Sequence, residues 1–252
     1  MKFERSKNPM FTDKAIAKAK AIEAKRRTSS GGDMDTADDM TVKGAIDKTV
    51  ILGGILLLTT LFSYYSPQSF YMPLGALGAA AVFIFTSFKP HLAPSTAPLF
   101  AVLEGLFVGT ISAIYAAQYG GIIFQAVSAT IATLLAMLMI YKSGIIPITQ
   151  KFRMGVSMAV GAIMLVYLIS WIGHFVGFTV PFIHESGPLG IGITVVIIGV
   201  AALNLLLDFD NFERGEEAGA PKFMECYYGM GLLFTLVWLY VEFLRLLSKL
   251  RD

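Results

Sequence analysis

Seven stretches of this chain are apolar and long enough to cross a lipid bilayer, and they restrict the folds that it can adopt. A hydrocarbon core about 30 Å thick needs roughly twenty apolar residues in a helix. The stretches cover residues 46–65, 71–88, 96–117, 121–141, 154–177, 187–208 and 223–247. Turn-forming sequences such as SPQS, KPHLAPS and RGEEAGAP separate them. We therefore predict an all-α polytopic membrane protein with seven transmembrane helices in a lipid bilayer.

The composition agrees with this prediction and argues against several other classes of protein. Hydrophobic residues make up 55% of the chain and charged residues 15%, whereas a soluble domain has about a quarter of its residues charged. The net charge is only +2 and the basic residues cluster near the N-terminus, so nothing indicates nucleic-acid binding. No hydrolase, phosphate-loop or metal-finger motif is present, and we expect neither an enzyme nor a cofactor. Small residues recur in GALGAAA and GPLGIGI, which allows close helix packing in lipid.

The chain divides into a polar tail, residues 1–44, and a transmembrane domain, residues 45–252. The tail is mixed in charge and ends in a Ser/Gly/Asp stretch, so we expect it to be flexible. With this basic tail in the cytoplasm, three loops on the cytoplasmic side carry Lys or Arg and the three opposite loops carry none. The basic C-terminal RLLSKLRD is the exception. We favour a full crossing by the last segment because it is long enough.

Ionisable residues in the spans are costly to bury and are therefore candidates for function. Glu104 lies in the third span beside two glycines, where it would be protonated or need a hydrogen-bond donor. Its structural alternative is a neutral acid that bonds across helices. Glu225 opens the seventh span and Glu242 nears its far end, about 25 Å away along the helix. For Glu242, a local ion pair with Arg245 is the simpler explanation.

Asp208 and Asp210 close the sixth span at its cytoplasmic end. They could simply mark the water boundary, and the glutamates of the following ERGEE sequence fit a solvated acidic loop. However, the helix dipole disfavours anions at a C-terminus, which favours a specific cation partner. Lys89 or Arg153 could supply that cation from neighbouring cytoplasmic loops.

Several motifs in this order resemble the transmembrane Bax inhibitor motif family, and most closely its bacterial branch. They are FAVLEGLFVG in the third span, an aspartate that closes the sixth span, a short acidic loop and LYVEFLRLL in the last span. The resemblance covers roughly residues 45–250. It implies outer helices around a central last helix, and a pH-sensitive calcium leak in the bacterial plasma (inner) membrane. In that family a carboxylate from each of the last two spans shares protons, and a basic residue after the second span can latch onto the sixth-span aspartate.

Asp208 matches the sixth-span aspartate of the family, and Lys89 lies where the latch cation would be. The second acid departs from the family pattern. LYVEFLRLL would assign that role to Glu242, which follows Asp208 by 34 residues, whereas the family spacing is about two dozen. The family spacing instead points to Gly231, with Glu225 the nearest acid. We favour Glu225 because its depth matches that of Asp208, and Glu242 stays the alternative.

The resulting hypothesis is a proton-gated cation leak in which Asp208 and Glu225 transiently bind calcium. Two carboxylates that lie close together in a low dielectric cannot both ionise cheaply, and calcium prefers oxygen ligands. Asp210, Glu242 and Glu104 are further candidates for ion or proton sensing, and Lys89 or Arg153 would compete with calcium. The alternative is a regulator that transports nothing and binds another membrane protein, such as a protease, through its tail.

Overall fold

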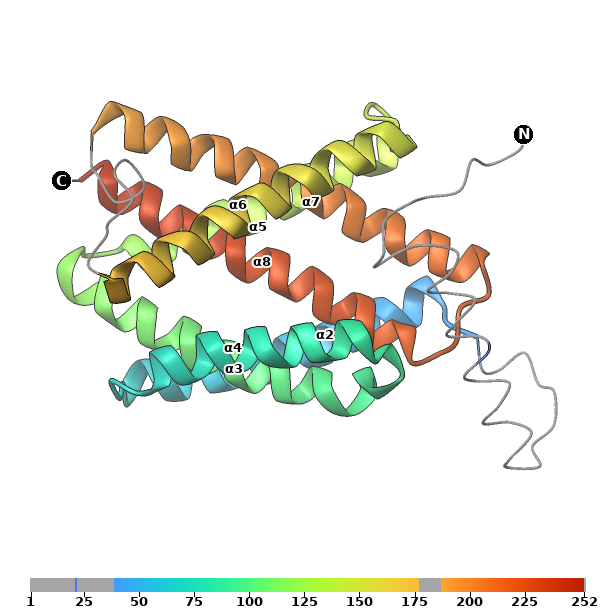
Figure 1. The fold of residues 1–252 in the computed structure, drawn as a ribbon, viewed down its shortest axis with the longest axis horizontal. Helices are drawn as coiled ribbons and strands as arrows, with labels where there is room; N and C mark the ends of the chain where they lie inside the picture. Colours follow the sequence, from blue (N-terminus) through green and yellow to red (C-terminus); the bar gives the residue numbers. More distant parts are fainter. Residues whose placement is uncertain (1–20, 22–38, 177–186, 252) are drawn as a thin grey trace. The chain divides into compact units, whose positions relative to one another are not determined.

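The part of the chain that the structure describes forms seven long helices, as predicted from the apolar stretches, and Figure 1 shows their arrangement along the chain. The structure is a computed structural model that describes residues 21, 39–176 and 187–251. The helices are α2 (Val42–Tyr65), α3 (Tyr71–Phe88), α4 (Ala93–Gln118), α5 (Ile122–Ser143), α6 (Gln150–Val176), α7 (Pro188–Glu217) and α8 (Met224–Lys249), and a short 3₁₀ helix, η2 (Pro90–Leu92), precedes α4. Each long helix has the length and hydropathy to cross a membrane, so this is an integral membrane protein.

Helix α7, the sixth span, continues well beyond its predicted end. The prediction of residues 187–208 stopped where charge begins, but the helix runs to Glu217. Charge marks the limit of the apolar segment and does not stop a helix. The turn that ends the helix lies at Gly219, whose φ of 56° is left-handed. Two backbone hydrogen bonds form a Schellman motif there: Ala220 N–H donates to the Gly215 carbonyl oxygen and Gly219 N–H donates to the Glu216 carbonyl oxygen.

The start of the first span also differs slightly from the prediction. The tail was predicted to reach residue 44, whereas α2 already begins at Val42 and Asp39 pairs with Pro221 in an antiparallel β-bridge. The prediction of flexibility for residues 1–38 lies outside the described residues, apart from residue 21. The root of the tail, residues 39–44, is therefore part of the folded domain.

Two compact units make up the chain: residues 1–111 with 208–234, and residues 112–207 with 235–252. In the first unit, α2, α3 and α4 approach closely at glycines. A Cβ at Gly105 would lie 2.6 Å from the Leu56 carbonyl oxygen of α2, and a Cβ at Gly75 would lie 2.6 Å from the Leu103 carbonyl oxygen of α4. Close packing at small residues is thus confirmed for GALGAAA. The prediction of close packing is wrong for Gly192 of GPLGIGI, where a Cβ would meet nothing within 4 Å.

Helix α8 is the most buried span and contacts other helices in both units. Of its most apolar 18-residue window, 61% is buried, against 50% or less for each other span. In the first unit it contacts α2, α3 and α7 through the pairs Gly229–Thr49, Phe234–Phe83 and Tyr228–Phe212. In the second unit hydrogen bonds join it to α4, α6 and α7 through the pairs Tyr240–Ser112, Glu242–Tyr167 and Thr235–Asn204. The predicted central position of the last helix is confirmed.

The last helix is also unbroken over its 26 residues, as a full crossing requires. Just beyond its end, Arg251 donates a hydrogen bond of 2.9 Å to the carbonyl oxygen of Gly120 in the α4–α5 turn. The basic C-terminus therefore has a hydrogen-bond partner at that turn. Which membrane face carries it stays a prediction.

Candidate functional site

One face of α7 carries buried polar side chains towards its end. Asn204, Asp208 and Asn211 follow one another at spacings of four and three residues, which places them on the same helix face. Asp208 is 8% exposed and Asn211 is 4% exposed. Asn204 donates a hydrogen bond of 2.9 Å to the Thr235 hydroxyl of α8. Polar groups in a span are stable only when they face protein or a water-filled space, so this stripe is directed into the protein.

Glu225, in the first turn of α8, is directed at the beginning of α2. Its side chain is 3% exposed, and its Oε1 accepts a hydrogen bond of 3.1 Å from the backbone N–H of Thr41. A Cβ at Gly44 would overlap the same carboxylate. Glu225 therefore occupies the N-terminal end of α2, a position at which the helix dipole favours a negative charge.

Glu216, near the end of α7, supports the same helix end. Its Oε1 accepts a hydrogen bond of 3.3 Å from the backbone N–H of Val42. The prediction of a solvated acidic loop is wrong here, because Glu216 is helical and its exposed carboxylate is bonded to another helix. The two ends of the α7–α8 turn thus each contribute a carboxylate to α2.

Asp210 has a partner within its own helix. Its Oδ2 lies 2.8 Å from Nε of Arg214, one turn further along α7. Its charge is neutralised locally, which leaves Asp208 as the buried α7 carboxylate that local pairing with Arg214 does not explain.

Glu242 lies at the far end of α8 from Glu225 and forms the predicted ion pair with Arg245. The Arg245 Nη1 to Glu242 Oε1 distance is 3.1 Å, and the Tyr167 hydroxyl of α6 donates to the same oxygen at 2.6 Å. The guanidinium of Arg245 also lies over the Tyr167 ring, 5.0 Å from its centroid. Glu242 thus belongs to a polar cluster of the second unit, whereas Asp208 and Glu225 both lie in the first unit.

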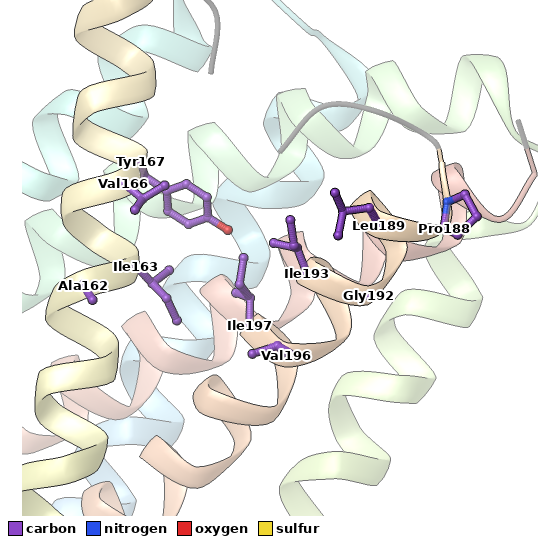
Figure 2. A pocket seen from close by; sticks show the side chains of 10 residues that line it. All are labelled: Ala162, Ile163, Val166, Tyr167, Pro188, Leu189, Gly192, Ile193, Val196 and Ile197. Atoms are coloured by element: carbon purple, nitrogen blue, oxygen red, sulfur yellow. The ribbon is translucent and has the colours of Figure 1, made fainter. Parts of the chain in front are cut away.

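A cavity of about 560 Å³ lies between α6 and α7 beside this cluster. In Figure 2 the Tyr167 side chain extends from α6 towards α7, and aliphatic side chains surround it. Its lining residues are Ala162, Ile163, Val166, Tyr167, Pro188, Leu189, Gly192, Ile193, Val196 and Ile197. Its only polar side chain is that of Tyr167, so the cavity suits an apolar group better than an ion.

Glu104 is buried in α4 and is 6% exposed. Within the described part of the chain its carboxyl group forms no hydrogen bond or ion pair. The predicted alternative, a neutral acid bonded across helices, therefore has no partner among these residues. The residue next to it, Gly105, forms the close contact with α2.

The two candidate latch cations lie in different surroundings. Lys89 is exposed, and its ammonium group lies over the Phe85 ring, 5.3 Å from the centroid. Arg153, in the first turn of α6, is only 3% exposed. A buried guanidinium must be compensated by other groups, which makes Arg153 the more constrained cation of the two.

No group of three or more His, Cys, Asp or Glu side chains is arranged to hold a metal ion in the described ranges 39–176 and 187–251. Calcium usually takes six to eight oxygen ligands. A calcium ion at Asp208 and Glu225 would thus need water or backbone oxygens in addition, and transient calcium binding there stays a prediction.

Sequence reasoning missed Thr41, Glu216 and Tyr167. Thr41 is the N-cap of α2 and accepts a hydrogen bond of 2.9 Å from Gly44 N–H; a threonine before an apolar run is a signal that could have identified it. Glu216 and Tyr167 contact partners more than 70 residues away in the chain. No local sequence pattern predicts such long-range contacts.

Comparison with known proteins agrees with the resemblance found in the sequence. A family model described as Bax inhibitor 1 like matches residues 8–252, nearly the whole chain. No curated protein and no solved structure gives a significant match.

Proposed function

Because the chain belongs to the Bax inhibitor 1-like family, we propose that it forms a pH-sensitive calcium leak across a bacterial plasma membrane, with its N-terminus in the cytoplasm. The gate in this proposal is a carboxylate pair between α7 and α8, the sixth and seventh spans. Asp208 and Glu225 form the pair.

The observation that carries the proposal is the placement of these two acids. Both are buried, with 8% and 3% of their surfaces exposed, and both belong to the first unit. Asp208 lies about two and a half turns before the end of α7, and Glu225 lies in the first turn of α8, the next helix along the chain. Burial of two acids in one compact unit is costly unless protons or cations neutralise them.

Protons and calcium would act on the same charge. Two neighbouring carboxylates in a low dielectric share protons as a coupled pair, and in the fully ionised state they attract a hard divalent cation. Protonation removes that attraction and allows the helix ends to repack. The latch is a further hypothesis, in which Lys89 or the buried Arg153 competes with calcium for the pair.

The main test is calcium flux in liposomes that contain the purified protein, measured against pH. We expect the wild-type protein to conduct with a pH dependence and Asp208→Asn to lose that dependence, because the amide cannot exchange a proton. Asp47→Asn is the matched control, since Asp47 is an exposed aspartate of α2. If Asp208→Asn keeps the wild-type flux and pH dependence, this mechanism is wrong.

The alternative function is a regulator that binds another membrane protein, such as a membrane-anchored protease. The observation in its favour is that residues 39–44, the root of the tail, dock on the α7–α8 turn, so a partner that holds the tail would act beside Glu225. Deletion of residues 2–38 spares this docked root. For a leak we expect flux to survive the deletion. Regulation would instead be favoured if neither the full-length nor the shortened protein carried flux and the deletion abolished binding to the partner.

A further inference from the structure

The first turn of α2 is held by residues from both sides of the α7–α8 turn. The Met40 N–H donates a hydrogen bond of 2.8 Å to the carbonyl oxygen of Ala220, and Asp39 pairs with Pro221. Two further backbone N–H groups, of Thr41 and Val42, donate to the side chains of Glu225 and Glu216. We name residues 39–44 the clasp.

The clasp is anchored by an apolar contact as well as by hydrogen bonds. Met40 is 1% exposed. A Cβ at Gly215 would lie 2.5 Å from its sulfur and 2.8 Å from the Tyr228 ring. Gly215 thus provides the space in which the methionine side chain sits between α7 and α8. Burial of this apolar side chain stabilises the contact.

The charges in this region explain why α2 needs carboxylates from other helices. Its own first turn contains no acid, and it contains Lys43, whose positive charge is unfavourable near the positive end of the helix dipole. Glu225 and Glu216 supply the missing negative charge. Anything that neutralises Glu225 therefore weakens the hold on α2.

From these contacts we propose that the clasp is an autoinhibitory contact: while Glu225 is ionised and caps α2, the end of α7 and the start of α8 are held closed. Neutralisation of Glu225 by a proton or a divalent cation releases residues 39–44 and lets the α7–α8 turn move. This inference rests on the proposed leak function, since it assigns a second use to one acid of the gate. It also makes the tail the element that senses the state of the gate.

The contact itself can be tested without any flux. Lys43 is exposed and lies in the first turn of α2, so a lysine-specific protease can cut after it only when this turn unfolds. In detergent we expect Glu225→Gln to be cut there about two- to fivefold faster than wild type, because the amide keeps an acceptor oxygen but loses the negative charge that the helix N-terminus favours. Glu217→Gln is the control, because this exposed glutamate lies next to Glu216 and has no bond to α2 among the described residues. Equal cleavage of Glu225→Gln and wild type would overturn the proposal.

The gating role is tested by locking the clasp. Residues paired across an antiparallel bridge have Cα atoms about 4.5–5.5 Å apart, within the range of a disulfide. We therefore expect Asp39→Cys/Pro221→Cys, in a Cys226→Ser background, to lose calcium flux when oxidised and to regain it when reduced. Undiminished flux through the oxidised, cross-linked protein would overturn the gating role.

These two experiments separate the clasp from the leak. If wild-type liposomes carry no flux, the proposed function fails, while the cleavage rates still decide whether Glu225 holds α2. Flux can also be present while oxidation of the lock leaves it unchanged and Glu225→Gln is cut at the wild-type rate. In that case the leak stands and the clasp is wrong.

Discussion

Replacement of Gly105 and Gly109 by alanine is expected to destabilise the protein strongly, although each change adds only one methyl group. In an exposed helix the exchange of glycine for alanine is favourable by roughly 0.5–1 kcal/mol. At these two positions the sign should reverse. We expect the double variant to lose about 2–6 kcal/mol, because overpacking costs about 1–3 kcal/mol at each site.

The reason is that the new methyl groups would meet backbone atoms of α2. A Cβ at Gly109 would lie 2.9 Å from the backbone nitrogen of Tyr64 and would overlap the carbonyl oxygen of Thr60. Backbone cannot rotate away as a side chain can, so α2 and α4 must separate. Separation would also break the 2.7 Å hydrogen bond between the Ser63 and Thr110 hydroxyls at this interface.

The measurement is the thermal unfolding of purified protein in detergent. Gly155→Ala/Gly161→Ala is the matched control. Both glycines are helical and lie in α6, and a Cβ at either position would meet nothing within 4 Å. The control should be as stable as wild type or slightly more stable. Equal stability of the two double variants would show that the close α2–α4 contact does not exist.

Much of this fold could be predicted because the bilayer imposes it. A span needs about twenty apolar residues, and six of the seven predicted segments end within about four residues of the observed helices. The seventh, α7, ran nine residues beyond its prediction, to Glu217, because charge ends the membrane segment but only the turn at Gly219 ends the helix. Hydropathy locates the membrane and leaves the helix ends to local backbone chemistry.

The site was less predictable because its contacts are long-range. The local pair Glu242–Arg245 was predictable, since three residues along a helix bring side chains together. The bond from Thr41 to Glu225 spans 184 positions of the chain, and nothing near either residue indicates it. Sequence reasoning could find Glu225 as an acid at the start of a span, but could not find that it holds the start of α2.

Glu104→Leu is expected to make the protein more stable and to reduce its calcium flux. Glu104 is 6% exposed, and its carboxyl group has no partner among the described residues. A buried polar group without a partner costs about 1–3 kcal/mol, which leucine would recover as a higher unfolding temperature. In the proposed leak, we expect a buried acid at this depth to take part in ion or proton movement.

Two measurements on the same variants decide this point. Thermal unfolding in detergent and calcium flux in liposomes should be compared for wild type, Glu104→Leu and Glu104→Gln, where glutamine keeps the polar group and removes the titratable proton. Higher stability of Glu104→Leu with reduced flux in both variants would support a role in conduction. Higher stability with unchanged flux would make Glu104 a tolerated defect of helix packing. Lower stability of Glu104→Leu would contradict the prediction, because it would mean that the carboxyl group has a stabilising partner.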